Sequence, residues 1–127
     1  MKFFRGDKMQ KEKLKINTFG EIGSTMCIST EDGEKIFSII KKAFDKNITV
    51  EISFLNIEMI TSAFLNAAIG QLYGKYEEKF IQQHLSVKDM ADEDKFLLKR
   101  VVVRAKDYFA NKKNMEKVIA EGLNENA

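Results

Sequence analysis

The hydrophobic period of the sequence changes within one continuous stretch, from Ile48 to Tyr76. In the first half an apolar residue occupies every second position, which predicts a β-strand with one buried face. These residues are Ile48, Val50, Ile52 and Phe54. In the second half the apolar residues follow helical spacing, at Phe64, Leu65, Ala68, Ile69, Leu72 and Tyr76. A strand that runs directly into an amphipathic helix predicts an α/β fold.

Two hydroxyl side chains, Thr61 and Ser62, stand where this helix must begin. Each can accept a hydrogen bond from an otherwise unpaired amide of the first turn. Helix capping is therefore the simplest role for Ser62. A regulatory or contact role stays open beside it, because a phosphate is tolerated at the positive end of a helix dipole. It would also add roughly −1.5 to −2 charges to the surface there.

This strand, loop and helix resemble the core of STAS domains (sulphate transporter and anti-sigma factor antagonist), and most closely the divergent bacterial branch called STAS-like domains of unknown function. In the antagonists the strand leads into an Asp-Ser-Ser-Gly-Leu segment, whose first serine is phosphorylated by a partner kinase. The resemblance places Ser62 at that phosphoacceptor position. Thr61, Ala63 and Phe64 replace the acidic residue, the second serine and the glycine. The similarity extends from about Leu14 to Phe109.

The resemblance implies a bacterial regulatory module without enzymatic activity, which docks a protein partner such as a histidine-kinase-like ATPase. The head of the central helix would make the contact. The expected partner-binding residues are Thr61, Ser62, Ala63, Phe64 and Asn66. For Phe64 two interpretations stay open: its ring belongs to the core stripe, or it obstructs the kinase approach used by antagonists.

Further periodic segments complete the predicted domain. We expect a first strand at 13–19, a helix from Ser29 or Thr30 to about Asn47, and a third strand at the sheet edge between Phe80 and Val87. A long helix at 93–111, capped by Asp92, and a short helix ended by Gly122 should follow. The prediction is a small mixed, mainly parallel sheet with helices mostly on one face. One domain, 13–121, would lie between a basic arm (1–12) and a frayed tail (122–127). The core residues predicted most directly are Val50, Ile52, Phe54, Leu65, Ile69, Leu72, Val101 and Val102.

The inventory of reactive side chains argues against catalysis. The chain has one histidine, His84, and one cysteine, Cys27, and they are far apart in the sequence. We expect His84 at the surface or a sheet edge and Cys27 as a small buried residue. The acidic cluster between Asp89 and Asp94 lacks the spacing of a calcium loop, so helix capping is its expected role. The sequence therefore predicts neither an enzyme, nor a cofactor, nor a metal site.

Charge supports a second functional class. The net charge is only +2, but residues 1–15 hold six basic and two acidic residues. The alternative function is a small-ligand or nucleic-acid-binding accessory domain that uses this basic arm and the long helix, although nucleic acid is the less favoured partner. No apolar stretch approaches the roughly 20 residues needed to cross a bilayer. We therefore expect a cytoplasmic protein without membrane contact, and the sequence leaves its oligomeric state open.

Overall fold

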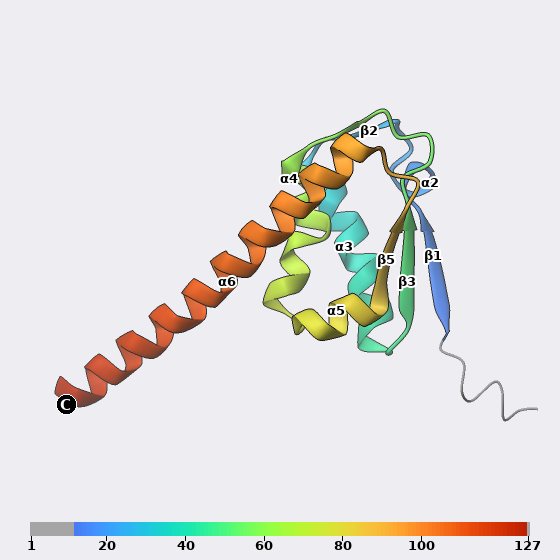
Figure 1. The fold of residues 1–127 in the computed structure, drawn as a ribbon. Helices are drawn as coiled ribbons and strands as arrows, with labels where there is room; N and C mark the ends of the chain where they lie inside the picture. Colours follow the sequence, from blue (N-terminus) through green and yellow to red (C-terminus); the bar gives the residue numbers. More distant parts are fainter. Residues whose placement is uncertain (1–11, 127) are drawn as a thin grey trace, which may run out of the picture.

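A three-stranded parallel sheet forms one layer of the fold, with the helices on one side of it (Figure 1). The computed structural model describes residues 12–126, with side chains to residue 122, so all of the predicted basic arm except Glu12 lies outside the described residues. The strands are β1 (Lys13–Asn17), β3 (Thr49–Ser53) and β5 (Leu85–Lys88), in the order β1-β3-β5. Ile52 in the middle strand pairs with Ile16 and Val87. The predicted α/β class and the central strand are confirmed.

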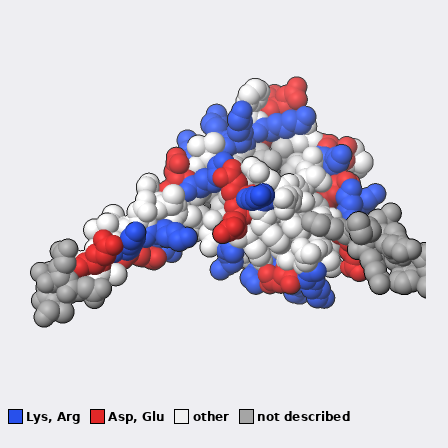
Figure 2. All heavy atoms as spheres, turned by 60° about the horizontal axis from the view of Figure 1, so that its bottom comes forward, with Lys and Arg blue, Asp and Glu red and all other residues white. Residues whose placement is uncertain are grey.

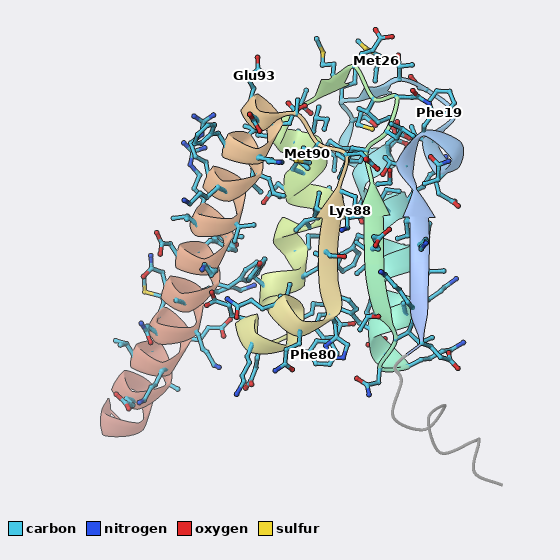
Figure 3. The ribbon with its side chains drawn as sticks, turned by 45° about the vertical axis from the view of Figure 1, so that its right-hand side comes forward. Phe19, Met26, Phe80, Lys88, Met90 and Glu93 are labelled. Atoms are coloured by element: carbon cyan, nitrogen blue, oxygen red, sulfur yellow. The ribbon has the colours of Figure 1, made fainter. Side chains whose placement is uncertain are left out.

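One face of this sheet is covered by helices and the other is polar. Val50 and Ile52 are buried beneath α3 (Thr30–Asp45), as the alternation in β3 predicts. Figure 3 shows the opposite face, with the strands in front of α3. There Lys13 Nζ lies 2.8 Å from Glu51 Oε1. Lys13, by its hydrogen bond and its charge, and more weakly Lys15 and Lys88, lower the pKa of the Glu51 carboxyl.

The segment between β1 and α3 is more structured than the sequence suggests. The predicted first strand ends at Asn17, because the Asn17 side chain accepts a hydrogen bond from Gly20 N (3.1 Å) and caps a short helix, α2 (Thr18–Ile22). Gly23 ends this helix in the left-handed region, at φ 77°. Two short strands, β2 (Met26–Cys27) and β4 (Met59–Ile60), then pair in parallel. Ser29 caps α3 as predicted, through a 3.0 Å bond from Asp32 N.

The central helix is interrupted where a continuous one was predicted. It consists of α4 (Ser62–Ala68) and a 3₁₀ turn, η1 (Gly70–Gly74). The backbone leaves α-helical geometry at Ile69, at φ −120°, and glycine at 70 lowers helix propensity there. The apolar stripe still faces the core, because Leu65, Ile69 and Leu72 are buried. Val50, Ile52, Phe54 and Val101 are buried as predicted, whereas Val102 is only partly buried.

The predicted third strand is wrong over its first half. Residues Glu78–His84 form α5, and the strand begins only at Leu85. The prediction of a surface or edge histidine is also wrong, since His84 is only 4% exposed. Its ring stacks on Phe80 at 3.8 Å between centroids. Nδ1 donates to the Phe80 carbonyl (2.9 Å), and Nε2 lies 2.7 Å from Asn47 Oδ1, so the buried ring is satisfied on both sides.

A single helix, α6 (Asp92–Asn126), ends the described chain. The predicted break after 111 and the stop at Gly122 are therefore wrong, and Asp92 is the first helical residue rather than the cap before it. The N-terminal half of α6 packs on the body through Val101 and Ala105, both buried. The second half projects away from the body (Figure 1). We call residues 111–122 the α6 arm.

Candidate functional site

The head of α4 is tied to the segment after β2 by one hydroxyl. Thr61 Oγ1 accepts a hydrogen bond from Phe64 N (3.2 Å) and so caps α4. The same hydroxyl donates to the Ile28 carbonyl (2.9 Å). Of the two hydroxyls at the junction, Thr61 is therefore the cap, and Ser62 is the first helical residue.

The predicted partner-binding residues separate into an exposed and a buried group. Ser62, Ala63 and Asn66 are exposed, and Thr61 is half-buried. Phe64 is fully buried, and its ring packs edge-on against Phe54 with centroids 6.5 Å apart. Phe64 thus belongs to the core stripe. Its assignment as a partner contact is a correction that the structure requires, because a side chain with no exposed surface cannot touch a docked protein.

Stability measurements should distinguish the roles of the Thr61 and Ser62 hydroxyls. We expect Thr61→Ala to lower the free energy of unfolding by about 0.5 to 2 kcal/mol, because it removes the cap. Ser62→Ala should change it by less than about 0.5 kcal/mol, the usual limit for an exposed side chain without a structural role. Urea denaturation of both variants measures the difference. An equal loss in the two variants would contradict the assignment of the cap.

An open groove lies between α4 and α6, with a volume of about 440 Å³. Ser62, Ala63 and Asn66 form one wall, and Val101, Arg104, Ala105 and Tyr108 form the other. We call this cavity the α4–α6 groove. The sequence alone did not predict Arg104 and Tyr108 as site residues. Their spacing of four residues places them on one helix face, but no sequence signal pairs that face with α4.

The chemistry of the α4–α6 groove suits binding. Ser62 and Tyr108 bring hydroxyls, Asn66 brings an amide, and Arg104 brings a permanent positive charge beside the buried Val101 and Ala105. A few polar groups around an apolar floor are typical of sites that fix the orientation of a bound group. Among the described residues that line the groove, none is a histidine, cysteine or carboxylate.

The other reactive side chains lie in the core. Cys27 is fully buried, and burial, with a smaller contribution from Asp32, raises the pKa of its thiol to about 11. Its thiol therefore stays protonated at neutral pH, and its nucleophilicity is low. Within residues 12–126, side chains that could ligate a metal do not gather in groups of three.

Exposed apolar side chains lie in the segments that lead into the head of α4 and pair beside it. Met26 and Met59 pair across the β2–β4 ladder and are 37% and 48% exposed. Ile28, whose carbonyl holds Thr61, is 44% exposed. Figure 3 places Met26 at the end of the molecule toward which the strands point. The β2–β4 ladder and Ile28 therefore add exposed apolar side chains, which we call the apolar rim, next to the capped start of α4.

Comparison with known proteins identifies the class of this domain. A family model described as "STAS-like domain of unknown function (DUF4325)" matches residues 32–95, which include most of α3, the central strand and α4. The chain belongs to this family, and the family suggested by the sequence resemblance is confirmed. No curated protein and no solved structure matches the chain at a significant level. In the described part of the chain, no helix is both long and apolar enough to cross a membrane.

Proposed function

We propose that this STAS-like domain is a non-enzymatic regulatory module that binds a protein partner at the α4–α6 groove. One observation carries the proposal: Ser62, Ala63 and Asn66 are exposed and open into a groove of about 440 Å³ whose other wall is α6. The apolar rim at Met26, Ile28 and Met59 extends the surface available to a partner. Protein interfaces combine an apolar centre with aromatic and arginine anchors in this way.

Phosphorylation of Ser62 is the proposed switch. Ser62 lies in the first turn of α4, where the backbone tolerates a negative group. A phosphate there would add about two negative charges to the groove and attract Arg104, which lines the same cavity. A partner that uses the groove in the neutral state would lose its contacts. The proposed kinase and partner is a histidine-kinase-like ATPase, the class that the family resemblance implies.

Substitution of Ser62 tests the switch. A partner captured with the wild-type protein from the native cell is purified and titrated with each variant. We expect Ser62→Asp to bind at least about tenfold more weakly, a loss of about 1.4 kcal/mol, while its circular dichroism spectrum and unfolding midpoint stay close to wild type. Ser62→Ala should bind as the wild type does. Ser38→Asp is the matched control, because Ser38 is an exposed helical serine on α3.

Wild-type affinity in both Ser62 variants would show that the interface lies elsewhere. If Ser62→Asp and Ser62→Ala both bind the partner with wild-type affinity, the head of α4 is only a capped helix start. Salt separates this proposal from nucleic-acid binding, since contacts to a phosphate backbone weaken steeply as salt rises. On the face shown in Figure 2 acidic and basic side chains are interspersed, which favours a protein surface over a phosphate-binding stripe.

A further inference from the structure

Polar side chains on both walls of the α4–α6 groove are not engaged by other parts of the domain. The ion pairs found among residues 12–122 do not include Arg104. The side-chain hydrogen bonds found there do not include Ser62, Asn66 or Tyr108. All four side chains line the same groove, so their donors and acceptors are available to a bound molecule.

The central helix and α6 run past one another in the same direction, with α4 beside the first half of α6 (Figure 1). A Cβ added to Gly70 would lie 3.6 Å from Ala105 Cβ, and one added to Gly74 would overlap the Phe109 ring. Each residue of the second contact lies four positions after its counterpart in the first, which fixes the order of side chains along the groove. Arg104 therefore lies toward the head of α4, and Phe109 lies toward η1.

The end of the groove near the head of α4 carries a single positive charge. Arg104 is the one charged residue among the described residues that line the groove. Its guanidinium presents a planar fork of donors that matches the two oxygens of a carboxylate. A carboxylate has one negative charge, which one arginine balances, whereas a phosphate monoester carries about two. The charge of this end therefore favours a carboxylate.

The other end of the groove is aromatic. The rings of Tyr108 and Phe109 meet edge-on, with centroids 5.0 Å apart, and Tyr108 is 59% exposed. The groove ends at Phe109, before the α6 arm begins. Aromatic rings pack well against one another in offset or edge-on contacts. A ligand whose carboxylate lies at Arg104 can therefore place a ring at this end.

We propose that the α4–α6 groove binds a small aryl carboxylate, whose carboxylate pairs with Arg104 and whose ring packs on Tyr108. Ser62 and Asn66, on the opposite wall, donate hydrogen bonds to the bound molecule. The groove volume of about 440 Å³ falls within the range of roughly 300 to 1,000 Å³ of small-molecule sites. The inference rests on the groove of the proposed function and names a ligand that regulates it, because an occupied groove excludes the protein partner.

An NMR titration of the chain alone with benzoate, phenylacetate and 3-phenylpropionate tests the proposal. We expect at least one of these acids to cause saturating shifts in the backbone amides of residues 62–66 and 104–109. The corresponding primary amides keep the ring and lose the charge. They should bind at least about tenfold more weakly, since a hydrogen bond to a charged group is stronger than one to a neutral group.

Variants of the groove distinguish this site from general attraction to a basic helix. Arg104→Gln should weaken binding of the acid at least about tenfold. Arg100→Gln is the matched control, because Arg100 is exposed one turn earlier on the same helix and does not line the groove; it should leave binding unchanged. Ala63→Leu should also abolish binding while Arg104 is kept, because the larger side chain fills the groove from the exposed surface of α4. The unfolding midpoint of each variant shows that it is folded.

Four results would each overturn the inference. They are the absence of saturating shifts with all three acids, equal affinity for the acids and their amides, equal loss in Arg104→Gln and Arg100→Gln, and tighter binding of phenyl phosphate than of any carboxylate. The titrations contain no partner protein. They can therefore fail while the Ser62→Asp titration with a purified partner succeeds, and the reverse.

Discussion

Truncation of Leu72 to alanine should lower the free energy of unfolding by about 2 to 5 kcal/mol. Leu72 has no exposed surface and lies in η1, between the core and the N-terminal half of α6. The truncation loses the free energy of transferring the removed atoms from water into the core. It also leaves a cavity, because packed neighbours relax only in part. Urea denaturation with a fixed slope for both proteins gives the difference directly.

Leu55→Ala is the control for this prediction. Leu55 is chemically identical but 58% exposed, in the turn after β3, so we expect its truncation to cost less than about 0.5 kcal/mol. A loss below half a kcal/mol in Leu72→Ala would show that the apolar stripe of the central helix is not the core face.

The strand at 49–53 and the capped start of α3 were predictable because each has a strong local signal. In β3 the side chains alternate strictly between the buried Val50 and Ile52 and the polar Glu51. At α3 a serine at 29 is followed by acidic residues at 31 and 32, which complement the positive end of the helix. These signals depend only on neighbours in the sequence, and tertiary contacts reinforce them.

The prediction of one strand between Phe80 and Val87 assigns the wrong period to its first half. Leu85 and Val87 alternate as in a strand and lie in β5. Phe80, Ile81 and His84 instead follow helical spacing, with Gln82 and Gln83 exposed on the other side. The buried stripe of this helix is hard to recognise in the sequence because one of its members, His84, is polar. Its burial depends on hydrogen bonds to Phe80 and to Asn47, 37 residues away. No local signal predicts that distant contact.

Neighbouring residues in the sequence also did not predict that α6 is continuous or that a groove lies between α4 and α6. The prediction ends the long helix at Asn111, although the polar residues that follow to Asn114 include neither glycine nor proline and form ordinary helix. Ser62 was a site candidate on its own, but Arg104, 42 residues later, becomes a site residue only because α6 packs beside α4. Tertiary packing decides which helix lies beside the head of α4. The hydrophobic periodicity of α4 or of α6 does not predict that the two are neighbours.

The packing of α3 on α4 depends on a residue without a side chain. Gly33 lies in the first turn of α3 and is buried. A Cβ added to it would lie 2.6 Å from the Phe64 carbonyl oxygen and 2.7 Å from Ala67 Cβ. The backbone of α4 is one of these two obstacles, and it cannot rotate away as a flexible side chain would. Glycine at this position therefore sets how closely α3 approaches the helix whose head carries Ser62.

Gly33→Ala should accordingly destabilise the protein by about 1 to 3 kcal/mol, the cost of overpacking a tight contact. On a helix surface without close neighbours, Gly→Ala stabilises by roughly 0.5 to 1 kcal/mol. A loss of stability at Gly33 would therefore indicate the close approach of α3 to α4. Gly122→Ala provides the control, since a Cβ on that helical glycine meets nothing within 4 Å. We expect it to leave stability unchanged or raise it.

Urea denaturation of both variants decides, and a gain in stability for Gly33→Ala would mean that α3 and α4 lie further apart than the structure places them. Because the displacement would act on α4, Gly33→Ala should also weaken partner binding at the groove, whereas Gly122→Ala should not.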